Sequence, residues 1–290
     1  MNINLRCSTF LGCALLLFGC GGGANGAGGG LDGTIYYQDI EDGSVYKMSL
    51  SDAKMTRLFA GFYPTRTPDG TFIYEANGDL VESPDGIQLR TIIKGNFDAT
   101  PRYDDSFSFP ALSPDGTLIA YNTLTNLVYI CRRDNGQIVS HFTESPPGAG
   151  LVGWERPSWT PDNRIVVAGN LGTPGLYISD AGWTTLTRFD PGINQPFDAK
   201  VSPKGGVVAF EENNDIYTLN LDGSGLKQLT STNDEEKMPT WSPDGSSVAA
   251  FSGLDLVTVH ADGSSPKTLS MGDPNVFFNF NTDQAFDWTK

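Results

Sequence analysis

Histidine and cysteine are scarce in this sequence, which narrows the chemistry that the chain can perform. Its 290 residues include 2 histidines and 4 cysteines, and all the cysteines except Cys131 lie within the first twenty residues. Cys131 falls in a strand-like apolar run, so a buried, inert thiol is expected rather than a disulfide or a nucleophile. Because zinc sites take Cys and His ligands, no metal site is assigned.

Motifs of covalent catalysis and of nucleotide binding are also missing. A Ser-His-Asp centre needs a histidine base, but His141 and His260 both lie in expected outer or near-outer strands, and no G-x-S-x-G sequence occurs. The segment Gly148–Gly153 fits G-x-G-x-x-G, yet it follows two prolines instead of a strand, and no helix is expected after it. We therefore expect no cofactor and assign no catalytic residue.

Basic residues are few compared with acidic ones. The chain has 19 Lys and Arg against 34 Asp and Glu, a net charge of −15 at pH 7. This charge disfavours nucleic acid and anionic lipid headgroups as partners, and favours a basic protein surface, a cation or a neutral glycan. The acidic loops at Asp104–Asp105 and Asp234–Glu236 could hold a hard cation, although acidic loops are usually just solvated.

The only long apolar run lies at the start of the chain. After Arg6, residues Leu11–Phe18 are apolar but too few to span a bilayer, which is typical of an export signal. The sequence Leu17-Phe18-Gly19-Cys20 resembles the bacterial lipobox, so residues 1–20 are interpreted as a lipoprotein signal peptide cleaved before a lipidated Cys20. An ordinary secretory signal that leaves a free protein is the alternative. The lipoprotein reading places the protein in the bacterial cell envelope, lipid-anchored, on the periplasmic or outer-membrane side.

Two further segments follow this signal. Residues 20–30 are nearly all Gly and Ala and are expected to be a flexible tether, so any membrane contact would be through the lipid anchor only. Residues 31–290 are rich in Gly, Pro and Asp, which suits a turn-rich all-β domain.

This domain contains an internal repeat. One phrase, with Ser/Thr-Pro-Asp-Gly as its core, returns at spacings of roughly 40 to 47 residues, the range of propeller blades. Pro presets φ, Asp can bond its own backbone and Gly accepts a positive φ, so the phrase predicts a tight turn between two strands. Two more strands joined by a second turn, such as Asp222-Gly223, complete a four-stranded unit. The phrase occurs at Pro64–Gly70, Pro110–Gly116, Pro157–Asn163, Ala199–Gly205 and Pro239–Gly245.

The two ends of this domain supply a sixth unit. Asp32–Tyr37 begins with the second half of the phrase, and Phe286–Lys290 supplies the missing strand. The sequence therefore predicts an all-β fold, a six-bladed β-propeller of four-stranded antiparallel blades, with the C-terminal strand pairing into the first blade.

The repeat phrases resemble the WD40-like repeats of TolB-type propellers and of the propeller in prolyl-oligopeptidase-type peptidases. The resemblance covers residues from about 31 to 290 and implies the propeller fold. Four positions depart from the usual phrase: Arg66 and Val201 replace an aromatic residue, Lys204 replaces Asp, and Asn163 replaces Gly.

Aromatic residues fall into two groups. Those at fixed repeat positions, including Trp159, Trp241 and Trp288, are expected to pack between blades. Others lie in or near the variable connections between blades, which emerge on one face of a propeller. We interpret these, together with one arginine, as a candidate binding face; the alternative is that they only cover the central channel. The candidates are Phe97, Tyr103, Phe107, Trp154, Arg156, Phe197, Phe277, Phe278 and Phe280.

These features favour a non-enzymatic cell-envelope lipoprotein, a monomer, that binds an envelope protein or a glycan. The alternative is a propeller enzyme, a lyase or hydrolase, acting on polysaccharide through carboxylates at the channel mouth such as Asp104, Glu155 or Glu235. A passive surface lipoprotein is the third possibility.

Overall fold

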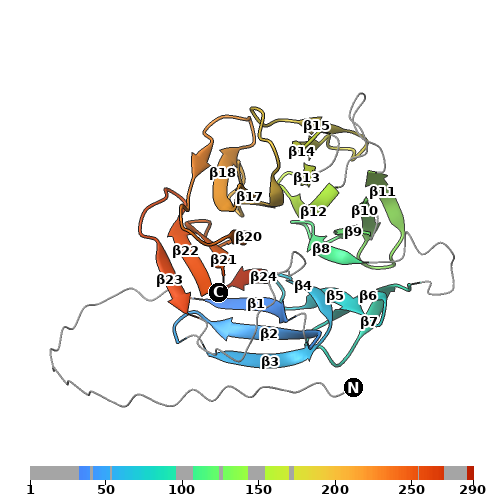
Figure 1. Cartoon of the computed structure of the whole chain (residues 1–290). Helices are drawn as coiled ribbons and strands as arrows, with labels where there is room; N and C mark the ends of the chain where they lie inside the picture. Colours follow the sequence, from blue (N-terminus) through green and yellow to red (C-terminus); the bar gives the residue numbers. More distant parts are fainter. Residues whose placement is uncertain are drawn as a thin grey trace, which may run out of the picture. The chain divides into compact units, whose positions relative to one another are not determined.

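A computed structural model of the chain describes residues 33–39, 42–52, 54–95, 107–123, 127–142, 154–169, 173–253, 255–270 and 286–290. Within these ranges there are strands and turns but no helix, hence no helix long and apolar enough to cross a membrane. The strands form six four-stranded antiparallel sheets, arranged as blades around a centre (Figure 1).

In each blade the chain runs from the innermost to the outermost strand, except that the innermost strand of blade 1 comes from the C-terminus. Blade 1 contains β24 (Phe286–Thr289), β1 (Thr34–Asp39), β2 (Ser44–Ser49) and β3 (Met55–Ala60). Blade 2 contains β4 (Phe62–Arg66), β5 (Phe72–Ala76), β6 (Asp79–Ser83) and β7 (Arg90–Ile93). Blade 3 contains β8 (Ser108–Leu112), β9 (Leu118–Asn122), β10 (Val128–Arg132) and β11 (Ile138–Phe142).

Blade 4 contains β12 (Trp154–Trp159), β13 (Ile165–Gly169), β14 (Gly175–Ser179) and β15 (Leu186–Arg188). Blade 5 contains β16 (Phe197–Val201), β17 (Val207–Glu212), β18 (Asp215–Asn220) and β19 (Lys227–Gln228). Blade 6 contains β20 (Glu236–Trp241), β21 (Ser247–Ser252), β22 (Asp255–His260) and β23 (Lys267–Ser270).

The second strand of most blades is the most deeply buried element. Every residue of β9, β13 and β21 is buried, with no alternation between the two faces of the sheet. Sheets that are covered on both faces have such continuous apolar strands, and here the neighbouring blades provide the cover. The hydrophobic core therefore lies mainly in the seams between blades.

The predicted turns are present and have the expected chemistry. In blade 3, Gly116 N donates to Ser113 O at 2.9 Å, and Asp115 Oδ1 accepts from Ser113 Oγ at 2.6 Å and from Thr117 N at 3.0 Å. Gly116 has a φ of 75°, the left-handed region in which a Cβ is disfavoured. In blade 5, Gly205 N still donates to Ser202 O at 2.8 Å, so Lys204 in place of Asp leaves the turn intact.

Ring closure occurs as the sequence predicts. Strand β24 pairs antiparallel with β1, with Ile35 opposite Trp288 and Tyr37 opposite Phe286. The C-terminal strand occupies the innermost position of blade 1 (Figure 1). Blade 1 therefore has four strands, as every other blade does. An exposed sheet edge at β1 is thereby removed.

The predictions for Cys131 and the two histidines are confirmed, but the predicted bounds of the connections between blades are not. Cys131 is fully buried, and burial raises the pKa of its thiol to about 12, which makes it inert at neutral pH. His141 lies in the outermost strand β11 and His260 in β22, as expected. The expected bounds of the connections were wrong at three candidates. Trp154 pairs with Gly169 in β13, and Arg156 lies in the bulge that follows within β12. Phe197 belongs to β16 and pairs with Glu211.

Several sequence-based predictions concern residues outside the described ranges. They remain predictions, and they are the signal peptide 1–20, Cys20, the tether, the segment Gly148–Gly153, and the candidates Phe97, Tyr103, Asp104, Asp105, Phe277, Phe278 and Phe280.

Candidate binding site at the channel mouth

The innermost strands of blades 2 to 6 share an irregularity close to their first residues. In each, the pairing register with the second strand shifts at one position, as in a β-bulge. A non-glycine residue with a positive φ lies at every shift, between 39° and 56°, and Pro or Ala follows it. These bulge residues are Tyr63, Phe109, Arg156, Asp198 and Met238. Bulges turn a side chain away from the regular alternation. Four of these residues line the cavity described below, whereas Met238 is buried in the core between blades 6 and 1.

Four of the bulge residues form a continuous series of contacts from blade 2 to blade 5. The rings of Tyr63 and Phe109 have centroids 4.6 Å apart. The guanidinium carbon of Arg156 lies 4.2 Å from the centroid of Phe109, a cation–π contact. On the next blade, Arg156 Nε is 2.7 Å from Asp198 Oδ1, and both side chains are largely buried. Because each contact crosses from one blade to the next, the ring geometry itself assembles this stack.

A cavity of about 440 Å³ opens beside this stack. It lies where the inner strands begin, which is the end of the blades reached by the connections from the preceding blade. Four acidic and two basic side chains belong to its wall, so acidic groups outnumber basic ones. Its lining comprises Tyr63, Ser108, Phe109, Asn122, Thr123, Trp154, Glu155, Arg156, Phe197, Asp198, Glu211, Glu235 and Lys237.

Glu211 is the most perturbed acid of this cavity. Burial, followed by the charge of Asp198, raises the pKa of Glu211 to about 8. Lys237 opposes this shift, and its Nζ lies 3.0 Å from Glu235 Oε2. Glu211 is therefore largely protonated at neutral pH and can donate a hydrogen bond as well as accept one.

Below the mouth, polar groups connect the inner strands across the channel. Asp287 Oδ1 lies 3.1 Å from Lys200 Nζ of blade 5, and its Oδ2 accepts from Arg66 N of blade 2 at 2.9 Å. Thr65 Oγ1 also donates to Pro110 O of blade 3. The remaining space here, about 50 Å³, is small compared with the cavity at the mouth, so a bound group would be held at the mouth.

Comparisons with known proteins agree with this architecture. Against the solved structures, TolB from Acinetobacter baumannii superposes with a TM-score of 0.65 at 17% identity, over 89% of this chain and 67% of that one. A putative TolB from Agrobacterium tumefaciens gives a TM-score of 0.58 at 18% identity, over 82% of this chain and 88% of that one. The fold is that of the TolB propeller.

Sequence matches to this TolB-like propeller are short. The Tol-Pal system protein TolB of Anaeromyxobacter dehalogenans is 34% identical over 94 residues, 29% of this chain and 21% of that protein. Dipeptidyl-peptidase 5 of Porphyromonas gingivalis is 47% identical over 38 residues, 13% of this chain and 6% of that protein. The chain thus matches well under two thirds of the length of either curated relative. No protein-family model matches it.

The TolB-like propeller brings only some of the predicted site residues to the cavity. Arg156, Phe197 and Trp154 line it, but only Arg156 and Phe197 are partly accessible. Phe107 and Trp154 were expected as exposed aromatics, and this is wrong for both, because they are 3% and 0% exposed. Phe107 packs against Tyr121, and Trp154 packs edge-on against Tyr177 in the core of blade 4. Both residues therefore belong to the hydrophobic core between blades.

Sequence reasoning did not find Tyr63, Phe109, Asp198, Glu211 or Lys237 as members of this site. A signal was available for the first three, because each directly precedes the Pro or Ala that opens a repeat phrase. The alignment of the phrases shows the shared position, but its bulge geometry becomes visible only in the sheet. In the part of the chain that the structure describes, no group of three or more His, Cys, Asp or Glu side chains could hold a metal ion.

Proposed function

We propose that the chain is a non-enzymatic cell-envelope lipoprotein whose channel-mouth face binds a protein partner through a cationic segment. The stack of Tyr63, Phe109, Arg156 and Asp198 beside an acid-rich cavity carries this proposal. Aromatic rings and a preordered arginine supply contact area at small entropic cost, as in the centres of protein interfaces. With Glu211 protonated, three carboxylates against two cations still leave the cavity wall with a net negative charge, which favours Lys or Arg on the partner. The TolB likeness, which concerns the fold, agrees with such a role.

Photo-crosslinking in the native envelope identifies the partner. A crosslinking amino acid at Glu155, on the cavity wall, is expected to capture a specific protein, whereas one at Ile87, at the other end of the blades, is not. Equal capture from both positions would contradict the proposed face.

Affinity for the captured partner then tests the stack. We expect Phe109→Asn to weaken binding by about tenfold or more, since it removes both ring contacts. Asn tolerates the positive φ at this position, so the bulge is retained. Ile87→Ala is the matched control, with unchanged affinity expected. Unchanged binding by Phe109→Asn, with a normal unfolding transition, would remove the assignment.

The lipid anchor has an independent test. Cells that express the full chain and take up labelled palmitate should label it, and Cys20→Ser should abolish the label and release the protein from the membrane fraction. Labelling that persists in the variant would show that the chain has no lipidation at this cysteine.

A second candidate function is polysaccharide cleavage, favoured by the buried acid Glu211 beside Asp198 in a cavity that also contains Glu155 and Glu235. A protonated and an ionised carboxyl group in one cleft are the usual requirement for glycoside hydrolysis. Envelope polysaccharides incubated with the chain would then yield new chain ends, and Glu211→Gln would stop this. Binding without cleavage would support the first function.

A further inference from the structure

A second cavity, of about 350 Å³, lies between blades 2 and 3. Strand β8 starts at the channel mouth, so the turn that follows it and the end of β10 lie at the opposite end of blade 3. The lining comes from that turn, from the end of β10, from the β10–β11 turn and from β7. It comprises Arg90, Gly116, Thr117, Arg132, Arg133 and Asp134. Three guanidinium groups and one carboxylate thus line a cavity in a protein whose net charge is −15.

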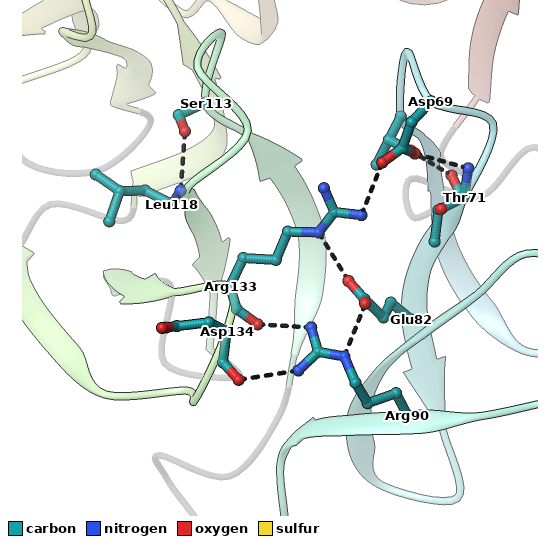
Figure 2. A network of polar contacts seen from close by, with 9 residues as sticks. Asp69, Thr71, Glu82, Arg90, Ser113, Leu118, Arg133 and Asp134 are labelled. Atoms are coloured by element: carbon teal, nitrogen blue, oxygen red, sulfur yellow. Dashed lines mark hydrogen bonds and ion pairs between the residues drawn. The ribbon is translucent and has the colours of Figure 1, made fainter.

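Two of these arginines are held in fixed positions by Glu82 (Figure 2). The carboxylate accepts from Arg90 Nε and from Arg133 Nε, each at 2.7 Å. Arg90 also donates to the backbone oxygens of Asp134 at 3.0 Å and of Arg133 at 2.8 Å. Asp69 lies 3.2 Å from Arg133 Nη2. The network therefore orients both side chains before any ligand arrives.

One nitrogen of Arg133 is left for a ligand. Among the described residues, Nη1 makes no hydrogen bond or ion pair, and it lies 4.0 Å from where a Cβ of Gly116, a lining residue, would be. Burial alone would lower the pKa of Arg133, but the hydrogen bond and charge of Glu82, with Asp69, raise it, so the group remains cationic. A side chain at Gly116 would occupy this space and is also disfavoured by the φ of 75°.

Arg132 has a different position in this cavity. It is exposed, and among the described residues it has no ion pair. A clamp that merely joined blades 2 and 3 would need Arg90, Arg133 and Glu82, but neither Arg132 nor an open cavity. A ligand could therefore occupy the cavity and accept hydrogen bonds from the guanidinium group of Arg132.

We propose that this cavity binds a phosphate-class oxyanion, with Arg132 and the preoriented Arg133 as its principal donors. Guanidinium groups donate paired N–H bonds that match the geometry of phosphate oxygens, and such charge-assisted bonds are stronger than neutral ones. The ligand chemistry is that of a free phosphate compound or of a phospholipid headgroup.

Titration of the full chain with inorganic phosphate at constant ionic strength tests the site. With ¹⁵N-arginine labelling, we expect the Nε–Hε resonances of Arg132 and Arg133 to shift in a saturable manner. Arg132→Gln should weaken the affinity about tenfold, the effect of losing one charge-assisted pair. Because Arg132 is outside the Glu82 network, this variant should unfold like the wild type.

Arg164→Gln is the control, since Arg164 is another turn arginine, in blade 4, and pairs with Asp162. It should bind phosphate like the wild type. Shifts that chloride reproduces, an Arg132→Gln variant with unchanged affinity, or an equal loss in the control would each overturn the proposal.

Vesicles separate the two sources of the ligand. Full-length wild type and Arg132→Gln are sedimented with phosphatidylcholine vesicles, with and without phosphatidylglycerol, so that any contribution of the N-terminal segment is the same for both. A deficit of the variant on the anionic vesicles supports a lipid headgroup. Equal sedimentation, with the phosphate difference retained, supports a soluble phosphate compound.

Discussion

Individual carboxyl groups in this protein have opposite environments. Turn aspartates such as Asp115 and Asp244 accept hydrogen bonds from neighbouring Ser or Thr hydroxyls and backbone N–H groups, which lowers their pKa. Glu211 is buried next to Asp198, which raises its pKa to about 8. Turn aspartates therefore stabilise the fold as anions, while the ionised form of Glu211 destabilises it.

Glu211 should make stability fall as pH rises. The pKa of an unperturbed glutamate is 4.5, and that of Glu211 in the folded protein is about 8. Between these two pH values the folded state therefore binds more protons than the unfolded state. The stabilisation that protonated Glu211 gives the folded state is complete below pH 4.5 and is lost as pH rises through about 8. We expect Glu211→Gln to flatten this decline, by on the order of a few kcal/mol, in urea unfolding across this pH range.

Asp85→Asn is the control for this measurement. Backbone hydrogen bonds from Gln88 and Ile87 lower the pKa of Asp85, so its contribution changes only in more acidic solution. An identical pH dependence of wild type and Glu211→Gln would show that Glu211 is ionised in the folded state.

At the scale of elements, tryptophans join the inner strands of neighbouring blades. Trp159 Nε1 donates to Ala111 O at 2.9 Å, and Trp241 Nε1 donates to Lys200 O at 2.8 Å. In blade 2, Arg66 replaces this aromatic, and its guanidinium carbon lies 5.0 Å from the ring centroid of Tyr36 in blade 1. In these three blades the repeat position therefore contacts the preceding blade, although the interaction differs.

Trp159→Phe isolates the hydrogen bond of this seam. It keeps an aromatic ring but leaves Ala111 O without its donor, so the free energy of unfolding should fall by about 1 to 2 kcal/mol. Trp159→Ala also removes the buried ring and should cost about 3 to 5 kcal/mol. Chemical denaturation of both variants gives the two values. Equal stability of Trp159→Phe and wild type would show that the contact contributes only packing.

At the scale of the whole molecule, the last strand holds the ring closed. Strand β24 pairs with β1, and Trp288 is only 7% exposed. Asp287 contacts blade 2 through Arg66 N and blade 5 through Lys200 Nζ. Closure is thus a set of long-range contacts between the two ends of the folded domain.

Deletion of residues 286–290 should therefore destabilise every blade. We expect the melting temperature to fall by about 10 °C or more and aggregation to increase, because β1 becomes an open edge. Deletion of the exposed Lys290 alone is the control and should melt like the full chain. If the longer deletion melted normally, blade 1 would be stable with three strands.

The sequence alone determined the blade count, the turns and the closure. These depend on local chemistry that repeats along the chain: Pro, Asp and Gly fix each turn, and apolar residues between the turns form strands wherever the chain places them. The missing first strand at one end and the spare strand at the other left a single way to complete the ring.

Only the tertiary structure decided which side chains meet. Tyr63, Phe109, Arg156 and Asp198 come together because bulges on four different blades point to one rim, and Glu211 joins them from a second strand. The sequence also did not determine which aromatic side chains are exposed. Phe107 and Trp154 were expected in exposed loops but are buried. Such contacts join residues far apart in the chain, and the curvature of the ring, which no local pattern records, sets their distances.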